Sequence, residues 1–284
     1  MNAYPNGEKF YRQSRRIAEE LKGIGIETEI RRTSEIDAAI RFDGRAEAVG
    51  GFDFAVYLDK DKYLGRILEK AGMRLFNSSE AVERCDDKML TYLALSDSGI
   101  EIPESVSAPL CYTPGVHPDE SFLSRTAAKL GFPLVAKKSF GSFGKDVRLI
   151  RTMDERTEKD FLYCPHFYQR YLAESAGRDI RVIVIGGRAV AAMERRAQKG
   201  EFRSNIELGG HGVCVRLTES FRLAAEKAAE ALQLDYCGVD LLEAGSKPVL
   251  CEVNSNAFFE GMEAATGMNI ARLYAEHIFR TVNG

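Results

Sequence analysis

The chain has 284 residues and a formal net charge of -3. Its length exceeds the needs of one small core and suits two or three packed lobes. The slightly acidic balance gives no basic footprint for nucleic acid, and no stretch approaches the roughly 18 apolar residues that cross a bilayer. Residues 1–7 have neither the basic nor the apolar region of a signal peptide. We therefore expect a cytoplasmic protein with neither nucleic acid nor a membrane as its partner.

The first 83 residues alternate between helix-like and strand-like segments. The predicted elements are a helix at 8–21, strands at 26–30 and 52–58, a helix at 63–70 and a strand at 74–76. Strands that alternate with helices predict a small Rossmann-like parallel α/β domain. Only a few residues precede the first helix, so we expect an opening strand that is short or cut off.

Residues 84–284 contain two hairpin patterns and several amphipathic segments. The predicted elements are a helix at 86–98, strands at 133–137 and 147–151, a hairpin at 182–193, a polar loop at 196–212, a helix at 219–233, a second hairpin at 238–254 and a helix at 269–281. The mixture predicts an α/β (α+β) protein.

The six cysteines show no C-x-x-C pair and no zinc-site spacing. Two of them, Cys237 and Cys251, lie in apolar runs, where a free thiol packs as a small hydrophobic group. We expect all six to be reduced, structural thiols.

The second hairpin carries polar residues inside strands that otherwise read as buried. Side chains alternate along a strand, so Glu252 and Asn254 point to the same side. Asp240 joins them if it lies opposite Glu252, which requires an odd-length loop such as residues 245–247. Two carboxylates and an amide oxygen suit magnesium. The alternative is a set of polar residues on a solvated sheet face.

Lys137 ends a strand directly before the glycine-rich segment 139–144. Small residues let backbone N–H groups approach phosphate oxygens, and a nearby ammonium balances their charge. No Walker motif is present, and a glycine-rich hairpin with a solvated lysine is the alternative.

Another candidate for phosphate or carboxylate binding is the loop 201–205, which follows a strand that ends at Glu194-Arg195-Arg196. An arginine there could clamp a phosphoryl group or a carboxylate, and an ordinary solvated loop is the alternative.

As an ordered set, these motifs resemble the ATP-grasp superfamily, with the nearest likeness to RimK-like amino-acid ligases and the LysX-type enzymes. The motifs in chain order are Lys88, Lys137 with its glycine loop, residues 169–172, Asp179 with Arg181, residues 203–205, Asp240, and Glu252 with Asn254. The resemblance covers about residues 84–284. It implies an ATP-grasp fold whose two lobes clasp ATP, with a smaller nucleotide lobe at about 105–170 and a C-terminal lobe at about 171–284, preceded by the domain at 1–83.

The resemblance also implies a role for each motif. Residues expected to bind ATP are Lys88, Lys137, Ser139, Gly141, Ser142, Phe143, Gly144, Gln169, Arg170, Tyr171, Leu172, Glu174, Asp179, Arg181, Arg203, Ser204 and Asn205. Among them, residues 169–172 would form the adenine hinge, and Glu174 or Asp179 would lie near the ribose. Residues expected to act on the transferred phosphoryl group are Lys137, Arg203 and Asn205. Magnesium, with manganese as an alternative, would be held by Asp240, Glu252 and Asn254.

Two segments depart from the family pattern. Arg170 stands where the RimK-like hinge commonly has Glu, and residues 255–261 replace the Ser-Pro-Gly of many members. The second segment would face the substrate, so the resemblance does not imply the acceptor.

The implied reaction joins a carboxylate to an amine through an acyl phosphate, because ATP turns a poor electrophile into one with a leaving group. Such phosphoryl transfer needs positioning and neutralised charge rather than covalent help from the protein. The expected partners are a small-molecule or peptide carboxylate, an amino acid (glutamate first), a protein acceptor as an alternative, and further copies of the chain in a homo-oligomer. The competing readings are a phosphotransferase that leaves phosphate on its substrate and a nucleotide-binding module without catalysis.

Overall fold

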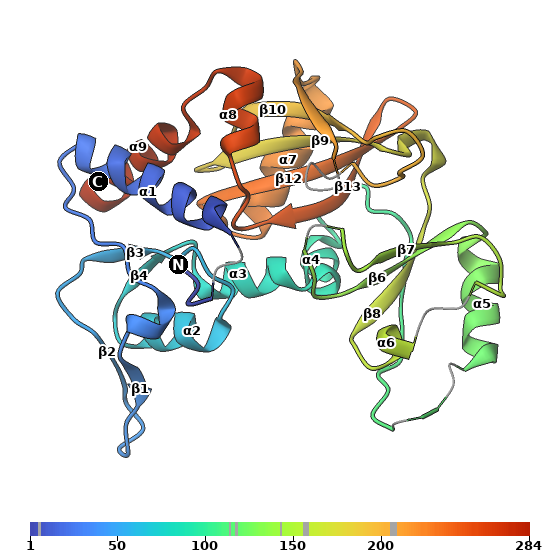
Figure 1. The fold of residues 1–284 in the computed structure, drawn as a ribbon, viewed down its shortest axis with the longest axis horizontal. Helices are drawn as coiled ribbons and strands as arrows, with labels where there is room; N and C mark the ends of the chain where they lie inside the picture. Colours follow the sequence, from blue (N-terminus) through green and yellow to red (C-terminus); the bar gives the residue numbers. More distant parts are fainter. Residues whose placement is uncertain (5–6, 114, 117–118, 143, 156–158, 205–208) are drawn as a thin grey trace.

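The computed structural model describes residues 1–4, 7–113, 115–116, 119–142, 144–155, 159–204 and 209–284 (Figure 1). Its helices are α1 (Glu8–Gly23), α2 (Lys62–Lys70), α3 (Ser79–Asp86), α4 (Lys88–Leu95), α5 (Glu120–Leu130), α6 (Lys159–Leu162), α7 (Glu219–Ala231), α8 (Glu260–Thr266) and α9 (Ile270–Asn283), with 3-10 turns η1 (Thr33–Glu35) and η2 (Ala173–Ser175). Its strands are β1 (Ala38–Ile40), β2 (Ala46–Ala48), β3 (Phe54–Val56), β4 (Arg74–Phe76), β5 (Ser105–Ser107), β6 (Leu134–Lys138), β7 (Val147–Ile150), β8 (His166–Arg170), β9 (Arg178–Ile185), β10 (Arg188–Arg196), β11 (His211–Cys214), β12 (Tyr236–Ala244) and β13 (Lys247–Asn254). No described helix has the length and apolar character that a membrane crossing requires.

The N-terminal segment is built around the parallel strands β3 and β4, which helix α2 connects. The side chain of Asp61 caps α2 by accepting from the N–H groups of Tyr63 and Leu64. The predicted strand at 26–30 is wrong. A strand needs a neighbouring strand for its backbone groups, but the N–H of Ile26 donates back to the carbonyl of Leu21, and Met1 pairs with Arg31 and Thr33 beyond the end of the segment.

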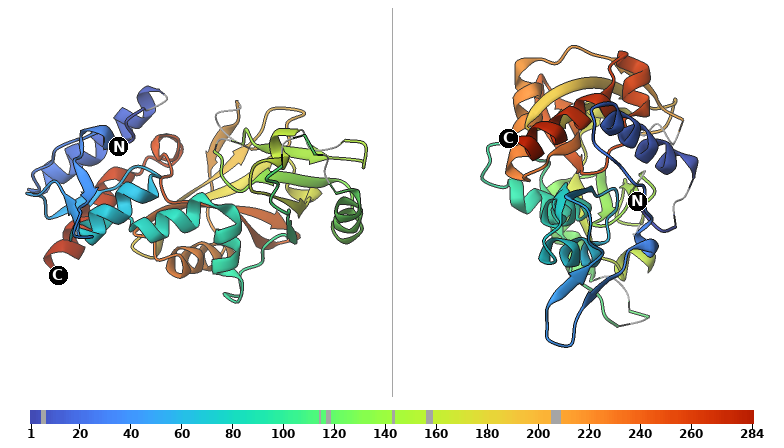
Figure 2. Two further views of the ribbon diagram at one scale, coloured as in Figure 1. Left: turned by 90° about the horizontal axis from the view of Figure 1, so that it is seen from below. Right: turned by 90° about the vertical axis from the view of Figure 1, so that its left-hand side faces the viewer.

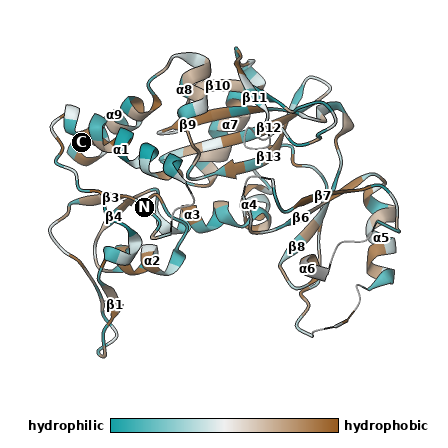
Figure 3. Cartoon of the chain, in the orientation of Figure 1, coloured by the Kyte–Doolittle hydropathy of each residue, from teal (hydrophilic) through white to brown (hydrophobic). Residues whose placement is uncertain are grey.

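The largest sheet has the strand order β11-β10-β9-β12-β13, and all of its pairs are antiparallel. Its apolar side chains alternate between two cores: Val182 packs with α7, while Ile183 packs with α9 and α1. Figure 3 shows the apolar character of these strands. Because helices cover both faces, β9 reads as an unbroken apolar run instead of an alternating one. Each such fully buried aliphatic side chain contributes about 1.5–3 kcal/mol.

A second antiparallel sheet, with the order β5-β8-β6-β7, packs on α5. Helices α3 and α4 precede it in the chain, where one helix at 86–98 was predicted. That prediction is wrong because Asp87 adopts an extended conformation, and its carboxylate caps α4 by accepting from the N–H groups of Met89 and Leu90.

Figure 2 shows an elongated molecule in which the N-terminal segment and the β5-β8-β6-β7 sheet lie at opposite ends of the larger sheet. The β6–β7 hairpin thereby faces the β12–β13 hairpin across a cleft, which both hairpins line. The predicted mixed α/β architecture is confirmed, and the two motifs expected to carry chemistry lie on opposite walls of that cleft.

Candidate functional site

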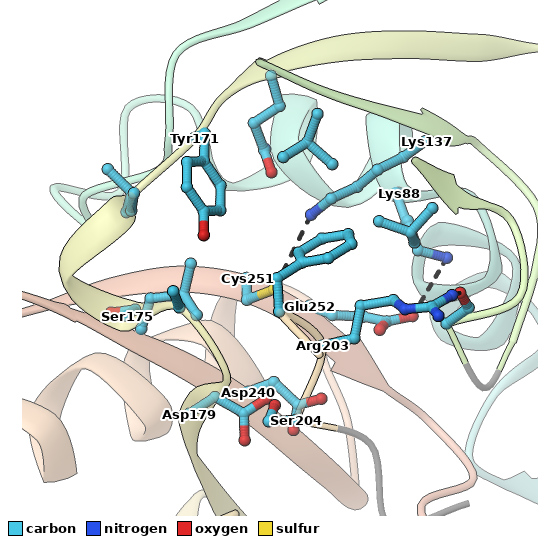
Figure 4. Close-up of a pocket in the computed structure, with 18 of the residues that line it drawn as sticks. Lys88, Lys137, Tyr171, Ser175, Asp179, Arg203, Ser204, Asp240, Cys251 and Glu252 are labelled. Carbon is cyan, nitrogen blue, oxygen red and sulfur yellow. Dashed lines mark hydrogen bonds and ion pairs between the residues drawn. The ribbon is translucent and has the colours of Figure 1, made fainter. Parts of the chain in front are cut away.

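A β-bulge brings the two carboxylates of the second hairpin onto one face. The turn is two residues long, Gly245 and Ser246, so the predicted odd-length loop is wrong. The register instead shifts after Asp240, where Cys251 is the extra residue, and Asp240 then lies directly opposite Glu252. Both carboxylates line one cavity (Figure 4). The predicted juxtaposition is therefore present, although the bulge produces it and the turn does not.

Asp240 is held by two arginines from neighbouring strands. The Nε of Arg181 donates to Oδ1 at 2.7 Å, and the Nη2 of Arg195 donates to Oδ2 at 2.8 Å. Arg195 also donates through Nε to Asp179 at 2.7 Å. Burial opposes ionisation of Asp240, but the two guanidiniums outweigh it and hold its pKa below the ordinary value. Burial likewise opposes the charge of Arg195, yet the carboxylates raise its pKa. The centre of the cleft is thus a fixed array of charges.

Three cations from different elements surround the glycine-rich loop between β6 and β7. The Lys88 Nζ donates to the carbonyl of Gly141 at 3.0 Å and lies 3.2 Å from the carboxylate of Glu252. Lys137 is 8% exposed, and its ammonium faces the Cys251 sulfur at 3.9 Å (Figure 4). Positive charge thus reaches the loop from both β6 and the start of α4.

Arg203 supplies the third cation and joins the two walls of the cleft. Its Nη1 donates to the carbonyl of Gly144 at 2.6 Å, and Glu201 pairs with it at 2.7 Å. The hydrogen bonds from Arg203 lower the pKa of Glu201 to about 2. Ser204 is buried beside it and lines the same cavity. Loop, lysines and arginine together form a surface suited to the negative charge of a polyphosphate.

The predicted hinge follows β8. Gln169 is buried and donates from Nε2 to the hydroxyl of Tyr92 at 3.1 Å and to that of Ser105 at 3.0 Å. Arg170 turns its side chain to Glu104 at 2.5 Å. Tyr171 and Leu172 line the cavity. Since the polar side chains of Gln169 and Arg170 have partners within the protein, a ligand here would meet the Tyr171 and Leu172 part of the segment.

Several predicted residues lie elsewhere. Glu174 is exposed and accepts from the N–H of Gly245, outside the residues that line the two cavities. Ser139 is buried and accepts from the N–H of Lys88 through its carbonyl. Phe143 and Asn205, both predicted to bind ATP, lie outside the described residues.

A second cavity of about 450 Å³ adjoins the first on the side of the N-terminal segment. Both cavities share Ser142, Arg195 and Glu252 as walls. Arg181 and Asn254 line only the second one. Its volume lies in the range of roughly 300–1,000 Å³ that small-molecule sites occupy. The first cavity, which the glycine loop and the three cations line, measures about 120 Å³, and the two cavities adjoin at their shared walls.

The donor set agrees with magnesium held jointly with a nucleotide. Within the described ranges, no three or more His, Cys, Asp or Glu side chains form a cluster that could hold a metal alone. Magnesium usually takes one or two carboxylates and completes its shell with water and phosphate oxygens, so Glu252 and Asp240 suffice in number, and Asp240 would share its oxygens with the guanidiniums of Arg181 and Arg195. The Nδ2 of Asn254 is buried and has no hydrogen-bond partner among the residues that the structure describes. This N–H group can donate to an acceptor atom of a ligand, whereas a metal would take the carbonyl oxygen of the same amide.

Sequence reasoning missed two residues that matter for this site. Tyr92 donates its hydroxyl to the carbonyl of Cys251 at 2.7 Å and thereby ties the bulge to the hinge. It sits in an apolar helix pattern that gives no sign of this contact. Lys60 lines the second cavity from the N-terminal segment, for which no motif was recognised.

Comparison with solved structures shows the fold. The fold is similar to that of a D-alanine–D-alanine ligase from Bacillus anthracis, with a TM-score of 0.72, 17% identity and coverage of 99% of this chain and 95% of that chain. It is also similar to the ATP-grasp ligase PsnB complexed with a minimal precursor, with a TM-score of 0.71, 19% identity and 95% coverage of each chain. The predicted ATP-grasp fold is confirmed.

The sequence comparison gives the family. The family model for the RimK-like ATP-grasp domain matches residues 85–278, and the chain belongs to this family. It is 35% identical over 230 residues to the N-acetylaspartylglutamate synthase A of Homo sapiens, covering 78% of this chain and 56% of that protein. It is 37% identical over 219 residues to a probable alpha-L-glutamate ligase of Halorhodospira halophila, covering 76% and 70%. The chain spans about half the length of the first of these relatives.

Proposed function

We propose that the protein is an ATP- and magnesium-dependent ligase that joins a carboxylate to an amine and releases ADP and phosphate. The observation that carries this proposal is the pair of adjoining cavities that share Ser142, Arg195 and Glu252. One cavity is lined by the cations and glycine loop that suit a polyphosphate, and the other has room for an acceptor. The names of the relatives favour glutamate as the amine.

In this proposal the nucleotide lies along the hinge, and its phosphates lie at the glycine loop. Lys88, Lys137 and Arg203 neutralise the charge that spreads over the transferred phosphoryl group. Magnesium, when bound, would neutralise phosphate oxygens and orient them, and Asp240, Glu252 and Asn254 would hold it. The acceptor carboxylate attacks the γ-phosphorus, so that an acyl phosphate forms and ADP leaves.

The amine then attacks the acyl carbon, and inorganic phosphate leaves as the new carbon–nitrogen bond forms. A closed cleft protects the acyl phosphate from hydrolysis, and the contact from Arg203 to the carbonyl of Gly144 already bridges the cleft walls.

The division of the chain into two domains, residues 1–83 and 84–284, is part of this proposal. So are the roles of the predicted ATP-binding residues, a peptide as an alternative carboxylate, manganese as an alternative metal, a homo-oligomer and a cytoplasmic location.

The test supplies purified protein with ATP, magnesium and pools of carboxylates and amino acids, with ADP, phosphate and product masses measured. We expect ADP only when a carboxylate and an amine are both present. A phosphorylated product that forms without amine would support a phosphotransferase instead, and nucleotide binding without turnover on any pool would support a binding module.

A pair of variants on the same hairpin tests the site. Glu252→Ala should lower turnover by at least about 100-fold, since it removes a charged group at the reacting centre. Lys247→Ala is the matched control, because Lys247 pairs with Glu101 and both residues lie outside the two cavity linings. Equal activity of the two variants would exclude the proposed role of Glu252.

A further inference from the structure

Lys60 lies at the boundary between the two cavities, although it belongs to the N-terminal segment. It follows the carboxyl end of β3, and ligands of parallel α/β sheets bind beyond that end of the strands. Its Nζ lies 2.6 Å from the carboxylate of Asp86 and 3.4 Å from the Oγ of Ser142. Ser142 is one of the walls that the cavities share. The ammonium of Lys60, in the N-terminal segment, thus contacts a residue of the glycine loop that lies 82 positions further along the chain.

The contacts of Lys60 leave it able to bind a further anion. An ammonium has three donors, and the contacts that the described residues make with it account for two. Its side chain keeps 41% of its surface exposed, and it lines the second cavity together with Glu252. The site that would receive the transferred phosphoryl group lies beside that shared wall, where the protein needs positive charge.

We propose that Lys60 is a phosphate-binding residue, whose ammonium contacts the γ-phosphoryl group as it passes from the nucleotide to the acceptor. This inference rests on the proposed function. Lys60 lies outside residues 85–278, which match the family model, so membership of the family does not assign this role. The N-terminal segment then contributes to the chemistry as well as to the acceptor cavity.

The alternative is that Lys60 only fastens the N-terminal segment to α3 through Asp86. The two roles differ in what happens when Asp86 is changed. Asp86→Asn removes the ion pair but keeps the ammonium, so a fastening role predicts that it acts like Lys60→Met. A phosphate-binding role predicts that only the loss of the ammonium matters.

The experiment measures binding of the magnesium complexes of ADP and of a non-hydrolysable ATP analogue by titration calorimetry. Lys60→Met should weaken binding of the analogue about tenfold, the size of one charge-assisted hydrogen bond, and leave ADP within about twofold because ADP lacks the γ-phosphate. Lys60→Arg should retain most of the affinity. Lys62→Met is the matched control, since its side chain is 42% exposed and pairs with Glu83 on α3 instead of contacting the glycine loop.

Three results would overturn the inference: unchanged binding of the analogue by Lys60→Met, equal losses for both nucleotides, or equal losses in Lys60→Met and Asp86→Asn. A wild-type protein that binds neither nucleotide would overturn the proposed function itself. The two failures are therefore distinguishable, and neither measurement depends on the identity of the acceptor.

Discussion

Replacing Arg195 with methionine should be among the most destabilising single changes in the cleft. Arg195 is 3% exposed, and its guanidinium bonds two carboxylates that are themselves buried, Asp179 at 6% and Asp240 at 3%. Methionine fills much of the same space but leaves Asp179 without its guanidinium. Asp240 keeps its contacts from Arg181, so only one of the two carboxylates loses its main partner.

The magnitude follows from that difference. Removing one member of a buried ion pair costs about 3–5 kcal/mol, and the surviving contacts of Asp240 place the expected loss near the lower bound, about 3 kcal/mol. At roughly 2–4 °C per kcal/mol, the melting temperature should fall by about 6–12 °C. Differential scanning calorimetry of the purified proteins measures this directly.

The loss should depend on pH. The pKa of Asp240 lies below its unfolded value, which is about 3.9. Its ionisation therefore stabilises the fold above about pH 4, and this contribution disappears as the pH falls through the folded pKa. The difference in melting temperature between the wild type and Arg195→Met should be largest above about pH 4, and the part that comes from Asp240 should shrink as the pH falls through the folded pKa of that residue.

The neighbouring Arg196 is the matched control, because its side chain is 56% exposed and pairs with Glu194 on the same strand. Arg196→Met should leave the melting temperature unchanged. A loss below about 1 kcal/mol for Arg195→Met, or the same shift in both variants, would refute the assignment of Arg195 as the anchor of the two aspartates.

Two further predictions concern packing and thiol chemistry. A methyl group at Gly238 would lie 2.6 Å from the Cβ of Ala257, so Gly238→Ala should lower the free energy of unfolding in urea by about 1–3 kcal/mol. Gly50→Ala should leave stability unchanged, because a methyl group there meets no described residue within 4 Å, and similar effects of both variants would contradict the close approach at Gly238. Burial raises the pKa of Cys85 to about 12, so its thiol stays protonated and shielded at pH 8, whereas the thiol of Cys214 is exposed. In the folded protein a disulfide reagent should therefore modify Cys214 but not Cys85. Rapid modification of Cys85 without unfolding would contradict its burial.

Local signals in the sequence determined most of the elements and the chemistry of the motifs. The amphipathic repeat predicted the helix that appears as α7, and the apolar run at 182–185 with Gly-Gly predicted the β9–β10 hairpin. Alternation along the second hairpin predicted that Glu252 and Asn254 point to the same side, and both line the second cavity. These features follow from the periods of helix and strand, which each segment carries within itself.

Tertiary structure decided how those groups are used. The bulge at Cys251 set the register of the carboxylates, and Arg195 reached Asp240 from 45 positions away. Lys60 reached the glycine loop from a segment without a recognised motif. No local period encodes such contacts, because they depend on how complete sheets and helices pack against one another. The sequence by itself therefore determined which chemical groups the protein has, and only the packing of distant elements decided which of them meet.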